Sequence, residues 1–530
     1  MKATIWFLVL IFICNCVQAQ RNVILIIADD LGTDYCGFYE DHGDTANLPH
    51  LNSLLDDGIR FQNAMSNPVC SATRAGILTG RYSFRTGVGY IVGSTSGSGQ
   101  LDVNEKTIPE LLKVYNPQIA TGLVGKWHLH NPTPPANLQN PNLMGFEHFE
   151  GPFIGAIPDY YNWLKYTNGV ASNITNCATS ENVNNAVDWI KNQNGNPFFL
   201  WLAFNAPHSP YHLPPAGMYS DTTLTGTPQH INANPKKYFK ASLEALDYEI
   251  GRLFDSLQAI NQLDSTDFIF VGDNGNSIQT AQTANPFRAK GTNYQYGVHV
   301  PLIISGPSVV DGGRVSDALV NTQDLFSTIL ELYGDTLWPS QIPVNKPVDS
   351  ESLLPIIKNQ SSQIRSWSFT ENFKTIPDST DGKAMRNMEY KLLHFDADGH
   401  QEFYHLSADS LELNNLLNGT LTQAELINYN YLCNEMSNLT GVGTFCNASS
   451  AVHEQEGLLN EIHVDPNPFT SFLNVDENHE RNYFQLVNAI GQIIYEGNQI
   501  ETINFSKLGK GIYFLKSRGN SATALKLMKN

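Results

Sequence analysis

Four short apolar runs, each followed closely by polar residues, constrain the fold of this chain more than any other feature of its sequence. The runs and their polar followers are residues 23–27 with Asp29 and Asp30, residues 121–124 with Lys126 and His128, residues 198–204 with His208, and residues 268–271 with Asp273 and Asn274. Continuous apolar runs of this length are typical of strands buried on both faces of a parallel sheet. Residues 242–257, between two of the runs, carry apolar side chains at helical spacing. This alternation of strands and helices predicts an α/β fold. In such folds ligands bind beyond the carboxyl ends of the strands, which is where the polar residues after the four runs are expected to lie.

The size and charge of the chain limit its organisation and its partners. With 530 residues it is too long for one compact core, so a large domain and something smaller are expected. The formal net charge of −19 argues against nucleic acid as a partner, because phosphate binding requires a basic surface. An anionic substrate would have to bind in a locally cationic pocket, against the field of the whole protein.

The N-terminal segment has the pattern of a secretory signal peptide, predicted over residues 1–19. A basic start at Lys2 precedes an apolar run over residues 5–13, and small residues stand at the cleavage position. No other apolar stretch of the sequence is long enough to cross a membrane. We therefore predict an exported protein without a transmembrane segment.

Removal of such a signal leaves an odd number of cysteines. They are Cys36, Cys70, Cys177, Cys433 and Cys446. In an oxidising compartment, the one that finds no partner is a candidate reactive residue. We predict a disulfide between Cys433 and Cys446, which are close enough in sequence to close a small loop.

Two changes of pattern divide the chain further. Residues 20–360 hold the four apolar runs and are assigned to the α/β domain. Residues 361–455 contain two runs, 389–393 and 402–406, whose pattern is typical of paired strands. Short strands with Gly and Asn turns fill residues 461–530 and predict a small β-sandwich module.

The sharpest motif of the chain is residues 70–81, CSATRAGILTGR. Taken alone, Cys70 before a short helix with Arg74 one turn later is typical of a nucleophilic cysteine of low pKa. The whole segment resembles the signature of the sulfatase family, C-x-P-S-R-x-x-L-x-T-G, in which the cysteine is oxidised to formylglycine. Ala72 and Thr73 depart from the commonest form of that signature. The resemblance implies maturation of Cys70 by either a formylglycine-generating or a radical enzyme.

Three further segments resemble elements of the same family. They are residues 125–129 (GKWHL), residues 206–210 (APHSP), and Lys290-Gly291 followed by Gly297 and Pro301. Two positions depart from the family pattern: His130 stands where Gly is usual, and His299 where Arg is typical. The resemblance covers roughly residues 21–420 and implies an alkaline phosphatase-like sandwich. That fold has a large mixed, mostly parallel sheet between helices and a smaller C-terminal antiparallel-sheet subdomain.

The resemblance also implies a metal site. Asp29, Asp30, Asp273 and Asn274, with Cys70 in its formylglycine form as a fifth ligand, match the family's metal ligands. Oxygen side chains with carboxylates in the majority form a hard site, which suits Ca²⁺, or Mg²⁺ as the alternative, rather than zinc.

The catalytic roles that the resemblance implies fall on seven positions. Hydrated formylglycine at position 70 is the nucleophile, Arg74 supports the hydrate, and Asp273 is a candidate to accept the nucleophile's proton. Lys126 and Lys290 bind sulfate oxygens. His208, with help from Lys290, protonates the leaving alcohol, and His128 helps to deprotonate the second hydroxyl. Taken singly, each has an ordinary explanation, such as a helix cap for an aspartate or a surface charge for a lysine. Their coincidence at the ends of several apolar runs favours the functional interpretation. Arg81 and Arg85, by contrast, are expected to be surface residues.

The final module resembles the C-terminal sorting domain of the bacterial type IX secretion system, in residues 464–469 (VDPNPF), 486–491 (LVNAIG) and 508–513 (LGKGIY). An ordinary carbohydrate-binding sandwich is the alternative. Sorting through the type IX secretion machinery implies a protein that is released or attached at the cell surface, and such delivery favours a macromolecular substrate. Sulfated oligosaccharides from algal polysaccharides such as ulvan, carrageenan or fucan are therefore the expected substrates.

Two other functions stay open at this point. A phosphodiesterase or phosphonate monoester hydrolase of the same superfamily is the nearest enzymatic alternative, but two metals would need His and Asp ligands beyond the single four-residue set. The non-enzymatic alternative is a protein that only binds sulfated glycan. The presence of Cys70, Lys126, His128, His208 and Lys290 argues against it.

Overall fold

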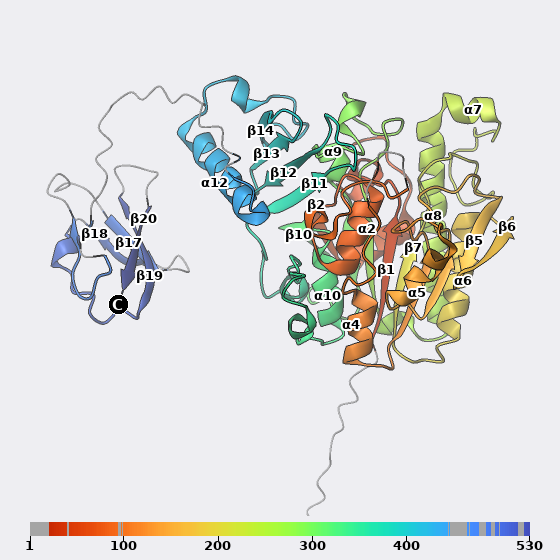
Figure 1. Ribbon diagram of the computed structural model, residues 1–530, viewed down its shortest axis with the longest axis horizontal. Coiled ribbons are helices and arrows are strands. Elements are labelled where there is room, and N and C mark those ends of the chain that lie inside the picture. The colour runs from red at the N-terminus through yellow and green to blue at the C-terminus, as the bar shows by residue number, and fades with distance from the viewer. Residues whose placement is uncertain are drawn as a thin grey trace, which may run out of the picture. The chain divides into compact units, whose positions relative to one another are not determined.

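The structure is a computed structural model that describes residues 21–39, 42–93, 97, 99–443, 445, 464–465, 467–475, 484–488, 493–497, 499–517 and 524–529. The chain divides into two compact units, Met1–Asn447 and Ala448–Asn530 (Figure 1). The predicted signal peptide lies outside the described residues, and so does Cys446, the predicted disulfide partner of Cys433. Among the helices described, none combines the length and the apolar character needed to span a membrane.

A ten-stranded mixed sheet forms the centre of the first unit, in the order β10-β2-β9-β8-β1-β7-β3-β4-β5-β6. The strands are β1 (Asn22–Ala28), β2 (Ile59–Met65), β3 (Ala120–Gly125), β4 (His148–Gly151), β5 (Trp163–Thr167), β6 (Val170–Ile174), β7 (Phe198–Ala203), β8 (Thr266–Gly272), β9 (Leu302–Ser305) and β10 (Arg314–Asn321). The four predicted runs are the neighbouring strands β8, β1, β7 and β3, and their pairings with one another are parallel. The predicted fold class is therefore confirmed.

Helices cover both faces of this sheet (Figure 1). The helices of the unit are α1 (Pro49–Asp56), α2 (Cys70–Thr79), α3 (Ser83–Thr86), α4 (Ile108–Tyr115), α5 (Asn140–Leu143), α6 (Ala178–Lys191), α7 (Pro228–Ala233), α8 (Pro235–Ala259), α9 (Gln295–Val298), α10 (Asp324–Leu332), α11 (Leu354–Ile357) and α12 (Gln423–Thr440). Alternate residues of β1 face opposite sides: Leu25 belongs to the core that includes residues of α2, α4 and α10, and Ile26 to the core that includes residues of α1, α6 and α8. Because both faces are covered, the central strands are apolar throughout rather than alternating.

Helix α2 begins where the functional motif begins. Val69 before it is extended (φ −143°, ψ 152°), and the helix ends at Gly80, which adopts a left-handed backbone (φ 70°) and donates to the carbonyl of Gly76. A Cβ at Gly80 would lie 2.7 Å from the Phe326 ring, so only glycine fits this end. All residues of the helix are buried. Cys70 therefore lies in the first turn of a wholly buried helix that ends at Gly80.

A smaller antiparallel sheet follows in the same unit. Its strands are β11 (Ser368–Asn372), β12 (Gly382–Arg386), β13 (Tyr390–Phe395) and β14 (Gln401–His405), paired in that order. The predicted pairing of two strands near residues 390 and 405 is confirmed, since Tyr390 lies opposite His405. Helix α12 packs on this sheet through Tyr429 and Leu432.

The second unit consists of short strands around an apolar core. Strands β15 (Val464–Asp465) and β16 (Asn474–Val475) pair with each other. Strands β17 (Phe484–Asn488), β18 (Ile493–Gly497), β19 (Gly511–Ser517) and β20 (Ala524–Lys529) form an antiparallel sheet in the order β18-β17-β19-β20. Phe469, Leu486, Leu515 and Leu527 are buried in the core between them. The strands predicted in this module are present.

Candidate active site

The site is assembled from the carboxyl ends of the four central strands. Backbone hydrogen bonds tie these ends together: the N–H of Asp29 donates to Ala206 O at 3.1 Å, and that of Asp273 donates to Ala28 O at 3.1 Å. Gly125 (φ 101°) ends β3, and a Cβ there would lie 1.8 Å from Ala203 O. Only glycine permits this close approach before Lys126. The sheet thus holds segments from four parts of the sequence at one edge.

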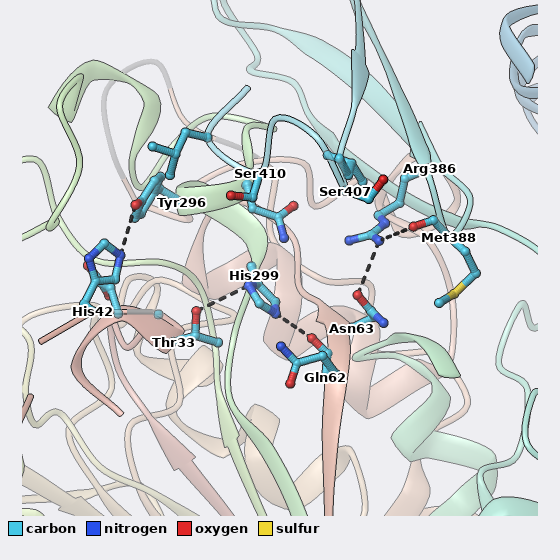
Figure 2. A pocket seen from close by; sticks show the side chains of 15 residues that line it. Thr33, His42, Gln62, Asn63, Tyr296, His299, Arg386, Met388, Ser407 and Ser410 are labelled. Atoms are coloured by element: carbon cyan, nitrogen blue, oxygen red, sulfur yellow. Dashed lines mark hydrogen bonds between the residues drawn. The ribbon is translucent and has the colours of Figure 1, made fainter. Parts of the chain in front are cut away.

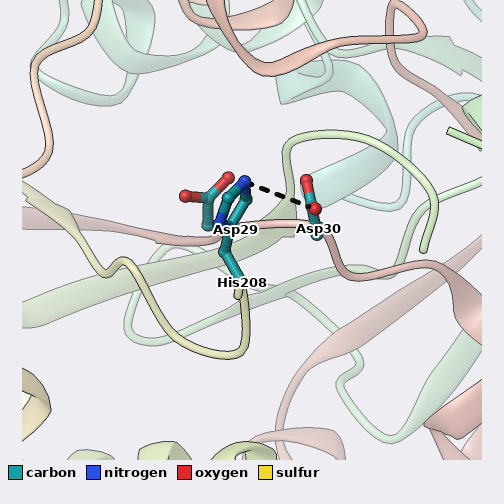
Figure 3. Close-up of side chains that lie close together, drawn as sticks. All are labelled: Asp29, Asp30 and His208. Carbon is teal, nitrogen blue, oxygen red and sulfur yellow. Dashed lines mark ion pairs between the residues drawn. The ribbon is translucent and has the colours of Figure 1, made fainter. Parts of the chain in front are cut away.

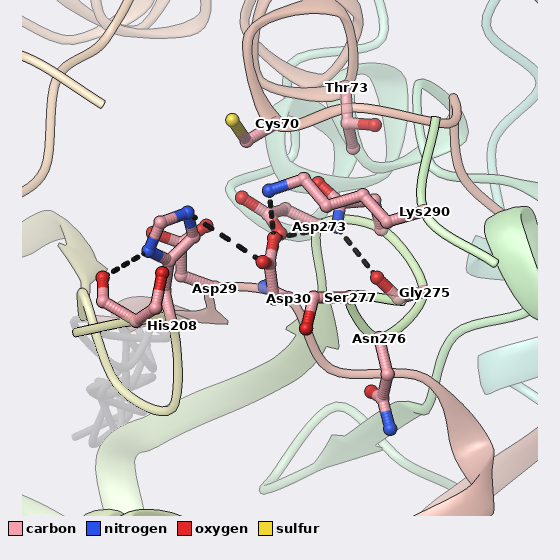
Figure 4. A network of polar contacts seen from close by, with 12 residues as sticks. Asp29, Asp30, Cys70, Thr73, His208, Asp273, Gly275, Asn276, Ser277 and Lys290 are labelled. Atoms are coloured by element: carbon pink, nitrogen blue, oxygen red, sulfur yellow. Dashed lines mark hydrogen bonds and ion pairs between the residues drawn. The ribbon is translucent and has the colours of Figure 1, made fainter. Parts of the chain in front are cut away.

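Every predicted site residue lies at this edge, and Figure 4 shows six of them: Asp29, Asp30, Cys70, His208, Asp273 and Lys290. Asp29 and Asp30 follow β1, Cys70 and Arg74 lie on α2, Lys126 and His128 follow β3, His208 follows β7, Asp273 and Asn274 follow β8, and Lys290 precedes α9. All are buried except His208 and Lys290, which are partly exposed. These two therefore mark the side from which a ligand can enter.

The acidic residues form two overlapping groups of ligand atoms. The ligand atoms of Asp29, Cys70 and Asp273 lie within 4.8 Å of one another, and so do those of Asp29, Asp30 and His208. In Figure 3 the ring of His208 faces Asp30, with Nε2 3.6 Å from Oδ2. Asp30 has a left-handed backbone (φ 63°), uncommon for a residue other than glycine and typical of functional sites.

Two buried oxygens of this cluster accept no hydrogen bond. They are Asp29 Oδ1 and Asn274 Oδ1. A buried polar atom without a partner is costly, and a divalent cation would satisfy both. The oxygen-rich donor set with its two orphaned oxygens therefore fits a hard cation such as Ca²⁺ or Mg²⁺.

Each carboxylate of the cluster is paired with a cationic side chain. Lys126 Nζ lies 2.6 Å from Asp29 Oδ2, Lys290 Nζ contacts Asp30 Oδ1, and Arg74 donates to Asp273 Oδ2 through Nε (3.1 Å) and Nη2 (2.8 Å). Three cationic groups are thus concentrated in a protein whose net charge is −19. Because a carboxylate matches each of them, the side chains of the cluster are close to neutral together, and a bound divalent cation would give it the net positive charge that an anionic substrate requires.

The buried charges shift the protonation of the site. Burial alone raises the pKa of Asp29, but Lys126 and the other nearby cations more than offset it and hold this pKa far below its usual range. Burial and the neighbouring Asp29 raise the pKa of Asp273 to about 6. Burial and Lys126 hold the pKa of His128 well below its usual value, so its imidazole is neutral at neutral pH.

The ring of His128 faces Cys70. Its Nδ1 lies 3.2 Å from the Cys70 sulfur, and its Nε2 lies 3.2 Å from the carbonyl of Val92. A carbonyl only accepts, so Nε2 carries the proton and Nδ1 presents its lone pair to position 70. Burial raises the pKa of the Cys70 thiol. The unmodified side chain is therefore a neutral thiol, not the low-pKa thiolate nucleophile that the motif alone suggests.

The two departures from the family pattern have structural partners. His130 accepts from Trp127 Nε1 at 3.1 Å, its Nε2 lies 2.8 Å from Leu101 O, and burial lowers its pKa to about 4. His299 lies 2.8 Å from Gln62 O through Nε2 and does not belong to the cluster. Arg81, expected at the surface, is buried and donates to both oxygens of Glu105.

Sequence reasoning missed Asn276, which links two segments of the site through hydrogen bonds. Its carbonyl accepts from the N–H of Lys290 at 3.0 Å, and its Oδ1 accepts from the N–H of Gly32 at 2.6 Å. Asn276 thereby connects the segments that carry Lys290 and Asp30. Its signal in the sequence is its position two residues after Asn274, in the same polar segment.

Comparison with known proteins identifies the family. The Sulfatase family model matches residues 21–335, more than half of the chain, and the chain therefore belongs to the sulfatase family. A model described as N-sulphoglucosamine sulphohydrolase, C-terminal, matches residues 287–439. The final module matches a secretion system C-terminal sorting domain over residues 463–530. The family resemblance and the resemblance of the tail are both confirmed.

Individual relatives agree with this assignment. Human N-acetylgalactosamine-6-sulfatase is 30% identical over 370 residues, which cover 63% of this chain and 65% of that protein. The uncharacterized sulfatase YdeN of Escherichia coli (strain K12) is 30% identical over 394 residues, which cover 65% of this chain and 67% of that protein. The chain thus spans just under two thirds of the length of the human relative.

Solved structures show the same fold. The crystal structure of Ps i-CgsB, also solved in complex with k-i-k-neocarrahexaose, has a TM-score of 0.66 and 24% identity, over 79% of this chain and 93% of that chain. The PsFucS1 sulfatase from Pseudoalteromonas sp. has a TM-score of 0.60 and 20% identity, over 80% of this chain and 91% of that chain. At these identities the likeness establishes the fold alone.

Proposed function

We propose that this protein hydrolyses sulfate esters at the cluster around position 70, with Cys70 converted to formylglycine and one divalent metal bound. The observation that carries the proposal is the pair of orphaned oxygens, Asp29 Oδ1 and Asn274 Oδ1, in a cluster that also contains Cys70 and three cationic side chains. Two such oxygens in one cluster are costly to bury, and coordination of a metal ion would offset that cost.

Asp29, Asp30, Asp273, Asn274 and position 70 would hold the metal, which is Ca²⁺ in the proposal, with Mg²⁺ as the alternative. When bound, the ion supplies Lewis-acid polarisation of sulfate oxygens. The hydrated aldehyde of formylglycine supplies an oxygen nucleophile with a second hydroxyl, which neither cysteine nor serine offers. A formylglycine-generating or radical enzyme would carry out the maturation.

The cationic side chains would bind the sulfate group. Lys126 reaches the cluster from the end of β3 and Lys290 from the segment before α9, and their ammonium groups would exchange aspartate oxygens for sulfate oxygens. Arg74 would keep its two hydrogen bonds to Asp273 and, one turn along α2 from position 70, would support the aldehyde hydrate there. The N-terminal end of α2 adds its positive dipole to the same place.

The two histidines are set for opposite proton transfers. His208 Nδ1 lies 2.5 Å from the carbonyl of Ser209, so Nδ1 carries a proton, and Nε2 faces the cluster. In the imidazolium form, Nε2 donates a proton to the leaving alcohol oxygen. His128 is neutral and presents the Nδ1 lone pair to position 70 at 3.2 Å, so it accepts a proton there. Asp273, whose pKa is raised to about 6, is a second candidate acceptor.

The proposed substrate is a sulfated oligosaccharide, from an algal polysaccharide such as ulvan, carrageenan or fucan. Three observations support it: a relative named for N-acetylgalactosamine-6-sulfate, a structural neighbour complexed with k-i-k-neocarrahexaose, and the sorting domain. After cleavage of residues 1–19, the type IX machinery would release the protein or attach it at the cell surface. In this proposal residues 20–360 form the catalytic domain, residues 361–455 its C-terminal subdomain, and residues 461–530 the sorting domain.

The test is sulfate release by protein whose residue 70 is shown by mass spectrometry to carry the aldehyde. The panel contains sulfated oligosaccharides from algal and animal polysaccharides and matched phosphate diesters. Cys70→Ala should abolish release, while Cys177→Ala, which removes another buried thiol, should keep it. Phosphodiester cleavage without sulfate release would assign the chain to the phosphodiesterase alternative. Glycan binding without any turnover by matured protein would assign it to the binding alternative.

A further inference from the structure

A cavity of about 280 Å³ lies apart from the catalytic cluster, between the large sheet and the smaller antiparallel sheet of the same unit (Figure 2). One wall comes from the segment after β1 and from Gln62 and Asn63 on β2. The opposite wall comes from Arg386 at the end of β12 and from Ser407 and Ser410 after β14. None of its lining residues belongs to the catalytic cluster. It is therefore a separate candidate binding site.

Arg386 is the unusual residue of this cavity. It is only 5% exposed, and its guanidinium donates to neutral acceptors: Asn387 O at 3.1 Å, Asn63 Oδ1 at 3.3 Å and Met388 O at 3.4 Å. Within the part of the chain that the structure describes, no carboxylate lies within 4.0 Å of it. A buried charge without a counter-ion is costly, so Arg386 lacks the partner that its burial calls for.

Three other arginines of the same unit, with side chains at most 7% exposed, are paired with carboxylates. Arg74, Arg81 and Arg365 each contact a carboxylate, on Asp273, Glu105 and Asp324. Burial lowers the pKa of Arg386 to about 10, and Glu412 opposes that shift only in part. Glu412 is itself paired with Lys391 Nζ at 2.7 Å.

The remaining polar groups of the cavity complement an anion that carries hydroxyl groups. Gln295 also lines the cavity; its buried Oε1 accepts no hydrogen bond and would have to turn toward the cavity to accept one from a ligand hydroxyl. Ser407 and Ser410 are exposed and offer further hydroxyls. The one carboxylate in the lining, Asp34, already accepts from Asn276 Nδ2 (2.7 Å) and from the N–H of Gln282 (2.8 Å). Its two oxygens are thus held within the protein.

We propose that this cavity is a second oxyanion site, in which Arg386 binds a sulfate or carboxylate group that is either carried by a sugar residue or free. Nε and Nη2 of Arg386 already donate to protein oxygens, which leaves Nη1 to donate to an oxyanion, and charge-assisted hydrogen bonds of this kind are stronger than neutral ones. The volume, at the small end for ligand sites, suits a single sugar residue rather than a longer chain. Only the sugar-borne form rests on the proposed function; the anion site itself does not.

The first experiment locates an oxyanion directly. Crystals of the full-length protein soaked in selenate, a sulfate analogue with an anomalous signal, should show an anomalous selenium peak next to Arg386. An oxygen of that selenate should lie within hydrogen-bonding distance of the guanidinium. The peak should persist in Arg314→Gln and disappear in Arg386→Gln. Arg314 is the matched control, because its guanidinium also donates to backbone carbonyls and it does not line the cavity. Selenium at the catalytic cluster but not at Arg386, or a peak that survives in Arg386→Gln, overturns the proposal.

Calorimetric titration with inorganic sulfate distinguishes a binding site from an adventitious ion only. Arg386→Gln should weaken one binding event by about tenfold or more, because charge-assisted hydrogen bonds are lost. Ser410→Trp keeps Arg386, alters only an exposed loop residue and should impair the same event by filling the cavity. An unchanged melting temperature of Ser410→Trp relative to the parent would show that the substitution does not impair folding. Identical titrations of all three proteins would mean an adventitious ion only and would overturn the proposal.

Kinetics distinguish the two sources of the anion. If a sugar residue carries it, Arg386→Gln should raise KM for a sulfated oligosaccharide about tenfold and leave KM for a small aryl sulfate unchanged. An unchanged KM for both substrates, together with the lost sulfate event, assigns the cavity to a free anion. No turnover of any substrate by matured parent protein would contradict the proposed function alone, because the selenate and titration experiments require no turnover.

Discussion

Lys126 Nζ lies 2.6 Å from Asp29 Oδ2 in the interior of the protein, while Oδ1 of the same carboxylate accepts no hydrogen bond. The two oxygens of one side chain are therefore in different states, one neutralised and one unsatisfied. Asn274 Oδ1 is unsatisfied in the same way. This asymmetry predicts how the protein responds to divalent cations.

Ca²⁺ should raise the melting temperature of the full-length protein, and a chelator should reverse the effect. A ligand that binds only the folded state stabilises it by about 2.7 kcal/mol at a hundredfold excess over Kd. Asp29→Asn should lose most of this response in differential scanning calorimetry. Asp247→Asn alters a buried carboxylate outside the cluster and should keep it. If neither Ca²⁺ nor Mg²⁺ changes the melting temperature of the parent protein, the proposed metal site is contradicted.

His208→Ala should slow turnover in proportion to the basicity of the leaving group. Because His208 is proposed to protonate the leaving alcohol, a sugar alcohol should suffer a loss in kcat of about 10²–10⁴. A nitrophenolate leaves without a proton, so the same variant should be much less impaired with that substrate. His230→Ala, which removes a histidine bonded to Tyr238 instead, serves as the control. Equal losses with both substrates would rule out the general-acid role.

Arg74→Gln should destabilise the protein strongly, apart from any effect on turnover. Arg74 and Asp273 form a pair that is wholly buried, and removal of one partner leaves a buried charge uncompensated. Such losses are about 3–5 kcal/mol, to be measured by urea unfolding in the presence of a chelator. Arg85→Gln breaks a partly exposed pair with Asp349 and should cost about 1 kcal/mol or less. Similar losses in both variants would argue against the buried pair.

Glu371 should make the folded protein less stable as the pH rises. Its Oε1 accepts from the N–H of Phe84, its Oε2 has no partner, and burial raises its pKa from 4.5 to about 7. The folded state therefore binds more protons than the unfolded one between these two values. The stability from this group is complete below pH 4.5 and is lost as the pH rises through 7, at up to about 1.4 kcal/mol per pH unit.

The measurement is the free energy of unfolding of Glu371→Gln relative to the parent at several pH values. The stability of the variant relative to the parent should rise from pH 5 to about pH 7 and level off above that, where Glu371 is ionised in both the folded and the unfolded state. Glu389→Gln, at an exposed position of the same subdomain, should show no such trend. A flat difference for Glu371→Gln would mean that this carboxyl titrates normally in the folded state.

The centre of the fold could be predicted because its signals are local. Each of β1, β3, β7 and β8 is an apolar run between polar residues. Such a run is a sufficient local signal for a strand that is buried on both faces. Strand β9 is apolar too, but it runs antiparallel between β2 and β8. That direction depends on the path of the chain, which no local pattern encodes.

The candidate site could be predicted because its residues occur in recognisable segments at strand ends. Arg81 and Arg386 could not, since an arginine is usually exposed. Arg81 is buried by its pairing with Glu105, and Arg386 by the packing of β12 beside Asn63 of β2. Those partners are distant in sequence, so burial of these arginines follows from tertiary structure alone.

The burial of Cys70 has a consequence for the order of events in the life of the protein. Its side chain is 1% exposed at the start of α2, beneath segments that follow β1, β3 and β8. An enzyme that modifies Cys70 needs access to its side chain, which the folded sheet does not give. The proposed conversion of Cys70 would therefore have to precede completion of the sheet, and the relative timing of folding and modification would set the fraction of converted molecules.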